Sequence, residues 1–135
     1  MNFTISEFCI SRLAIPQAVA DKILKYHIVP MQTIRTKRGI KIWASAHSGY
    51  RPRLHELRMG RDGLSEHVFR NKGAVDWTCQ NFSENNELFL KDIINYTDYT
   101  RIAVYDTFIH CDYKGTERKL FSSDSNSNWT FIKLI

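Results

Sequence analysis

Two histidines and one aspartate have the side-chain types that a metal site needs. His67 and Asp76 lie nine residues apart in the stretch SEHVFRNKGAVDW, and His110 follows later in FIHCD. Zinc in a catalytic site takes three nitrogen or oxygen ligands from the protein and leaves a fourth position open. Two imidazoles and one carboxylate satisfy that count. The same residue types also occur at surfaces and in ordinary hydrogen bonds, so their positions in the fold must decide.

Strands are the elements expected to position these three side chains. Residues 73–77 are predicted to form a strand that carries Asp76, and His67 precedes this strand. Residues 101–105 and 108–113 read as two strands joined by a turn at 106–107, and His110 lies in the second. Because side chains alternate along a strand, Trp77 is expected on the face opposite Asp76.

The rest of the chain predicts helices and further strands in one domain spanning residues 1–135. The apolar spacing predicts helices over 16–35, 52–59 and 81–95, and strands over 40–46 and 129–134. Pro30 is expected to kink or interrupt the first helix, and residues 122–128 are expected to form a polar loop. The tryptophans, which all fall in predicted strands, are expected in the core. The fold class is therefore α+β, with helices packed on one mainly antiparallel sheet.

Charge and cysteine content limit the partners and the compartment. Nineteen Lys and Arg against fourteen Asp and Glu give a net charge of +5, which suits an anionic polymer such as nucleic acid or a bacterial cell-wall component. No recognised nucleic-acid-binding motif is present, so no nucleic-acid partner is expected. The three cysteines lack Cys-x-x-Cys spacing. We expect buried thiols in a reducing compartment, and one disulfide with a single thiol left over is the alternative.

Four motifs occur in an order that resembles the zinc DD-peptidase family. They are SGYR at 48–51, SEH at 65–67, GAVD at 73–76 and YDTFIHCDYKG at 105–115. The family includes D-alanyl-D-alanine carboxypeptidases and shares its fold with the hedgehog signalling domain. The resemblance covers roughly residues 20–115 and implies a hedgehog/DD-peptidase-like fold.

The resemblance also implies roles for residues at the matching positions. It makes His67, Asp76 and His110 the ligands of a zinc ion. Arg51 would hold the substrate carbonyl or carboxylate and stabilise the oxyanion as it forms. The motifs also imply that Ser48, Tyr50 and Ser65 contact the substrate. Ser65 would in addition support the loop beside His67. The implied activity is hydrolysis of peptidoglycan stem peptides by a metal-activated water, as a D,D- or L,D-carboxypeptidase or endopeptidase.

The general base has two candidates. Members of the family carry an acid three residues before the final histidine, and Thr107 stands there in this chain. Asp106 and Asp112 flank His110 and are the alternatives, with Asp112 also able to orient His110 as a hydrogen-bond partner. Thr107 favours a second hypothesis, in which the same fold keeps its metal but acts as a non-catalytic cell-wall-binding or virion structural module.

The N-terminal stretch and the hydropathy suggest how such a protein would reach its substrate. MNFTISEFCISRLA has no basic start followed by a long apolar run, so no signal peptide is expected. No apolar stretch approaches the length of a membrane span. Small catalytic domains of this kind resemble phage lysis or virion enzymes. We therefore expect a monomer in the host cytoplasm that another factor delivers to the cell wall, or a virion component.

Overall fold

Strands form one mixed sheet in the computed structural model, which describes residues 2–11 and 14–135. Within these residues the sheet has six strands in the order β1-β2-β4-β3-β5-β6, and the pairs are antiparallel except β3 with β5. The strands are β1 (Ile42–Ala44), β2 (Ala74–Cys79), β3 (Arg101–Val104), β4 (Ile109–Asp112), β5 (Lys119–Ser123) and β6 (Trp129–Leu134). The α+β class with a mainly antiparallel sheet is confirmed. Strand β5 was missed, because its short, partly polar sequence runs into the stretch expected to be a loop.

The first helical segment runs without a break from Gln17 to Arg38. It comprises α1 (Gln17–Lys22), the π-helical turn η2 (Ile23–Ile28) and α2 (Val29–Arg38), and it ends at Gly39 with φ of 66°. Pro30, in the first turn of α2, has no N–H to donate to the carbonyl of Tyr26. The hydroxyl of Tyr113 donates to that carbonyl instead, at 2.6 Å. The helix therefore continues past the proline, and the departure from α-helical geometry precedes it.

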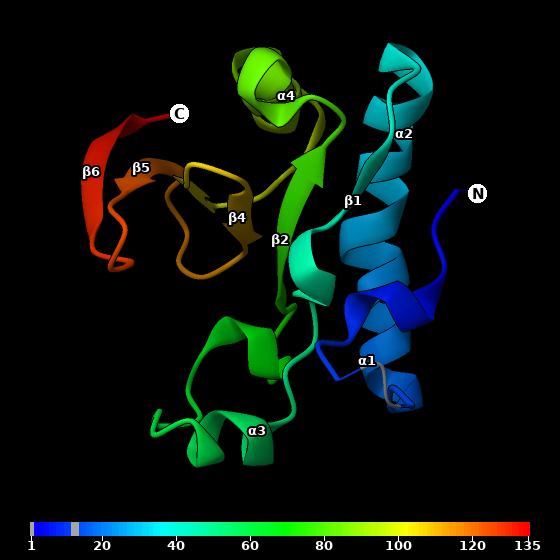
Figure 1. Ribbon diagram of the computed structural model, residues 1–135, viewed down its shortest axis with the longest axis vertical. Coiled ribbons are helices and arrows are strands. Elements are labelled where there is room, and N and C mark those ends of the chain that lie inside the picture. Colours follow the sequence, from blue (N-terminus) through cyan, green and yellow to red (C-terminus); the bar gives the residue numbers. More distant parts are fainter. Residues whose placement is uncertain (1, 12–13) are drawn as a thin grey trace.

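The other helical elements are shorter or lie later in the chain. They are η1 (Ile5–Phe8), η3 (Ser45–His47), α3 (Arg53–Arg58), η4 (Glu66–Val68) and α4 (Phe82–Tyr96). Helix α4 contacts both α2 and β2, and Figure 1 shows α2 running alongside β1 with α4 across one end of β2. Apolar residues from α2, α4 and the sheet share one core.

Strand alternation divides the sheet into a core face and a polar face. Val75 and Trp77 of β2 belong to the core, as do Ile109 and Cys111 of β4. The residues between them therefore face the other side. Asp76 is the direct cross-strand partner of His110 in the β2–β4 register. Pairing of these two strands is thus what places two of the predicted ligands side by side.

The three cysteines are buried and free. Burial raises the pKa of the Cys79 thiol to about 11 and that of Cys111 well above its usual value. The expectation of buried thiols is confirmed, and the alternative of a disulfide is not.

Candidate metal centre

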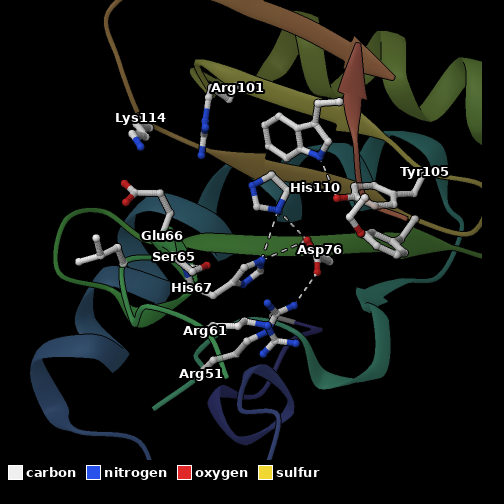
Figure 2. A pocket seen from close by; sticks show the side chains of 14 residues that line it. Arg51, Arg61, Ser65, Glu66, His67, Asp76, Arg101, Tyr105, His110 and Lys114 are labelled. Atoms are coloured by element: carbon white, nitrogen blue, oxygen red, sulfur yellow. Dashed lines mark hydrogen bonds and ion pairs between the residues drawn. The ribbon is translucent and has the colours of Figure 1, made fainter. Parts of the chain in front are cut away.

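His67, Asp76 and His110 converge at one point on the polar face of the sheet, and all three are buried. Their facing atoms lie within 4.8 Å of one another. The Nδ1 atom of His110 is 2.9 Å from Asp76 Oδ1 and 3.3 Å from His67 Nε2, and His67 Nε2 is 3.3 Å from Asp76 Oδ1 (Figure 2). Two nitrogens and one oxygen at these separations could hold a metal ion.

The far side of each histidine ring is fixed by an acceptor. His67 Nδ1 lies 2.8 Å from the carbonyl of Gly49, and His110 Nε2 lies 2.8 Å from Asp112 Oδ2. A carbonyl and a carboxylate only accept, so these two nitrogens must donate. A neutral imidazole then has its lone pair on the other nitrogen, which points into the group. Hydrogen bonds of this type orient the histidines of metal sites.

The SGYR segment is held tightly against the N-terminal turn. A Cβ on Gly49 would lie 2.6 Å from the carbonyl oxygen of Phe8, so glycine permits the close approach. The backbone N–H of Arg51 donates to the carbonyl of His67 at 2.8 Å, and that of Asp76 to the carbonyl of Ser48 at 2.9 Å. The segment therefore links two of the three converging residues through its backbone.

The loop that follows His67 depends on a second glycine. Gly73 has φ of +83°, and a Cβ there would lie 2.1 Å from the ring of Phe69. Phe69 is buried and has a left-handed backbone with φ of 62°. Gly73 thus allows the loop to pack Phe69 close to the start of β2.

Charges within the group stabilise a cation at its centre. Burial opposes ionisation of Asp76, but His67 and His110 lower the pKa of this carboxyl well below its usual range. Burial disfavours the charged form of His110, yet its bonds to Asp112 and Asp76 raise the pKa of its imidazole to about 9. Two carboxylates around one imidazole favour positive charge, whether it is a proton or a metal ion.

Arg51 lies directly beside the group. Its Nη2 atom is 2.7 Å from Ser48 Oγ and 3.3 Å from Asp76 Oδ2. Its Nη1 atom is 3.9 Å from Glu56, a fully buried carboxylate that also pairs with Arg61. Glu56 was not among the residues predicted from sequence, because a charged residue in a polar, arginine-rich helix gives no sign of burial.

The residues predicted to contact substrate fall into two groups. Ser65 lines the pocket and accepts a hydrogen bond from the backbone N–H of His67 at 3.2 Å. Ser48 is buried and donates to Asp76 at 2.7 Å, and Tyr50 packs against Phe69. Ser48 and Tyr50 do not line the pocket. They are placed to support the site from behind.

The two candidate bases are placed differently from each other. Asp112 is fully buried behind His110 and is bound by Arg101 through Nε and Nη2, at 2.9 and 2.6 Å. Burial raises the pKa of Asp112, but His110 and Arg101 outweigh it and lower the value to about 2. Asp106 is exposed in the turn between β3 and β4 and does not line the pocket. Thr107 is exposed as well, and its carbonyl accepts from Thr78.

A pocket of about 460 Å³ opens over the group. Most of the lining residues that sequence reasoning missed are charged or aromatic, among them Glu66, Arg101, Tyr105, Lys114 and Trp129. Placement of Trp129 in the core was wrong. Its ring lies 5.2 Å from that of His110 and its Nε1 donates to the hydroxyl of Tyr105. Edge strand β6 turns this tryptophan toward the pocket.

No family model, curated protein or solved structure matches this chain. Within residues 2–11 and 14–135, no helix has the length and apolar character needed to cross a membrane. The function must therefore be argued from the site itself.

Proposed function

We propose that this protein is a zinc metallopeptidase that hydrolyses peptidoglycan stem peptides, as a carboxypeptidase or endopeptidase of the zinc DD-peptidase type. The observation that carries the proposal is the convergence of His67 Nε2, Asp76 Oδ1 and His110 Nδ1 at the floor of an open pocket. Two nitrogens and one carboxylate oxygen fit zinc and leave a position open toward the pocket. Delivery to the cell wall by another factor, or carriage in a virion, belongs to the same proposal.

Each residue near the group has a defined part in such a reaction. Zinc bound there would polarise the peptide carbonyl and lower the pKa of a water molecule. Arg51 holds its guanidinium beside Asp76, where it can donate to the carbonyl oxygen as negative charge develops. Ser48 accepts a hydrogen bond from that guanidinium, Glu56 lies within ion-pair distance of it, and Trp129 shields His110 from solvent on one side.

A non-catalytic metal-binding module is the second candidate. Among the described residues, the carboxylates that line the pocket are Asp76 and Glu66, and neither Asp106 nor Asp112 is among them. A peptidase of this type needs a base that takes a proton from water and passes it to the leaving amine. The binding module needs none.

Purified chain incubated with purified peptidoglycan, with zinc or with chelator, separates the two candidates. We expect one zinc per chain by elemental analysis and chelator-sensitive release of peptide fragments, read by mass. Free D-alanine would identify a carboxypeptidase, and cleaved cross-links an endopeptidase. Stoichiometric zinc without any fragment would establish the binding module instead.

Alanine variants test the ligand assignment. His67→Ala and His110→Ala should each lose stoichiometric zinc, because two remaining ligands bind it much more weakly. His55→Ala is the matched control, since His55 lies in α3 outside the converging group. Full zinc retention in both ligand variants would refute the site.

A further inference from the structure

Unlike charges face one another at one end of the pocket. Figure 2 shows Arg51 and Arg61 on one side of the converging residues, and Glu66, Arg101 and Lys114 together on the other side. All five line the pocket. The second end thus combines one negative and two positive side chains.

These charges are not neutralised by each other. Within the described residues, the Glu66 carboxylate and the Lys114 ammonium form neither an ion pair nor a hydrogen bond, with one another or with other groups. Both side chains therefore leave their charge available to a bound molecule.

Arg101 is held rigidly while keeping part of its guanidinium free. Its Nε and Nη2 atoms bind Asp112, and its guanidinium carbon lies 4.9 Å from the centre of the Trp129 ring. Its Nη1 group makes no hydrogen bond to the described part of the chain. A guanidinium that is already oriented loses little entropy when it binds a ligand.

The backbone ties this end of the pocket to the candidate metal ligands. Glu66 immediately precedes His67 in η4, and the N–H of Lys114 donates to Asp112 Oδ1 at 2.9 Å. Asp112 in turn binds His110. A group bound between Glu66 and Lys114 would therefore lie at a fixed position relative to His67 and His110.

We propose that this end of the pocket binds an α-amino-acid head group that carries a free ammonium and a free carboxylate. Glu66 accepts from the ammonium, and Arg101 and Lys114 donate to the carboxylate. A simple anion would be repelled by Glu66 and a simple cation by the two bases, so only a zwitterion uses all three. The inference rests on the proposed function, and it names substrates whose side chain ends in such a head group.

Two stem pentapeptides that differ only at the third residue test the proposal. One carries meso-diaminopimelate and the other L-lysine, so the side chains differ by a single carboxylate. Binding to the zinc-loaded chain is measured by NMR titration, and cleavage is read from the same samples by mass. We expect the diaminopimelate peptide to bind about tenfold more tightly, the gain from one charge-assisted contact of modest strength.

Variants assign the preference to individual side chains. Lys114→Met should reduce it to about twofold, and Glu66→Gln should weaken both peptides alike, because both carry the ammonium. Lys91→Met, on the exposed side of α4, is the control and should keep the preference. Arg101 is left intact because it also holds Asp112.

Equal affinity of the wild-type chain for both peptides would overturn the proposal, and so would a preference that survives Lys114→Met. Failure of the proposed function has a different signature. If the chain discriminates between the peptides but cleaves neither, the head-group site is supported and the peptidase is refuted. If both peptides are cleaved and bind with equal affinity, the peptidase is supported and the head-group site is refuted.

Discussion

His110 is held by a carboxylate at each ring nitrogen. Asp76 faces Nδ1 within the converging group, and Asp112 faces Nε2 from the opposite side. Arg101 fixes Asp112 through three contacts of 2.6–3.1 Å. The imidazole therefore cannot rotate without breaking a buried charge-assisted hydrogen bond.

Asp112→Asn should weaken zinc binding by about 10- to 100-fold, the usual cost of losing the partner that orients a ligating histidine. The asparagine keeps the size of the side chain but not its charge. Zinc affinity is measured by competition with a chromophoric chelator, and turnover is measured at saturating zinc. A base variant would keep its zinc affinity and lose rate only.

Asp106→Asn is the companion of that variant and tests the other candidate base. Its carboxylate is exposed in a turn, so zinc affinity should not change. Lost turnover at full zinc content would show that Asp106 reaches the reacting water. If both variants hydrolyse peptide like the parent, neither aspartate is the base.

Arg51→Gln should cut peptide hydrolysis by about two to three orders of magnitude, the usual loss for one oxyanion-stabilising donor. Zinc content should remain stoichiometric, because Arg51 contacts Asp76 through Oδ2 whereas the converging atom is Oδ1. Arg58→Gln, on the exposed side of α3, is the matched control. Wild-type turnover in Arg51→Gln would refute the role, and an unfolded variant would show that Arg51 mainly neutralises buried Glu56.

The π-helical turn η2 places a buried histidine between the helix and the sheet. His27 Nε2 donates to the carbonyl of Lys72 at 2.8 Å, and its Nδ1 accepts from the hydroxyl of Tyr99 at 2.7 Å. Trp77 donates to the same hydroxyl at 3.1 Å. Lys72 lies in the loop between His67 and β2, so this chain of hydrogen bonds connects the helix to the loop that carries a candidate ligand.

Burial lowers the pKa of His27 from 6.5 to about 4. The unfolded chain therefore takes up a proton at a higher pH than the folded chain does. Above pH 6.5 the neutral His27 therefore contributes about 3 kcal/mol to the free energy of unfolding. This contribution should be lost as the pH falls from 6.5 toward 4. Below pH 4 the folded chain is protonated too, and the contribution is gone.

His27→Gln removes this titration and tests it. Urea unfolding of both chains in chelator, at intervals from pH 7 to pH 4, gives the difference in free energy of unfolding. The variant should be less stable at pH 7 but should lose about 3 kcal/mol less over the interval. Parallel curves would mean that His27 does not control the acid sensitivity.

Strand alternation made much of the fold predictable, and strand pairing did not. The apolar residues flanking Asp76 and His110 predicted both strands and the faces of their side chains, and the core positions of Val75, Trp77, Ile109 and Cys111 agree. The cross-strand register that joins the two depends on contacts across 34 residues, which no local pattern encodes. The meeting of Asp76 and His110 in one site was therefore predicted from the resemblance of motifs and not from the strand pattern.

The pocket wall was the least predictable part. Arg101 in β3 and Lys114 in the loop after β4 are neighbours through the β3–β4 pairing, whereas Trp129 of edge strand β6 joins them because β5 lies between β3 and β6. The sequence of β5 gave no strand signal, so the neighbours that it creates could not be foreseen. Glu66 lies in the SEH motif, which had been singled out for Ser65 and His67.

Binding of zinc should stabilise the whole chain, because its ligands come from distant elements. His67, Asp76 and His110 belong to η4, β2 and β4, and the unfolded chain does not hold them together. At a free zinc concentration 100-fold above Kd, the free energy of unfolding should rise by about 2.7 kcal/mol. For a domain of this size that corresponds to a rise in Tm on the order of 10 °C.

Three thiols of the unfolded chain also bind zinc, so the measured rise in Tm has this value as its upper bound. Calorimetry with zinc and with chelator gives the shift, and the same pair of scans on His67→Ala gives the part that does not come from the site. The variant should show a small rise or a fall, since the unfolded chain keeps its thiols while the folded chain has lost a ligand. His55→Ala should shift like the parent. An equal rise in His67→Ala would place the stabilising zinc elsewhere in the molecule and would remove the link between metal binding and the pairing of β2 with β4.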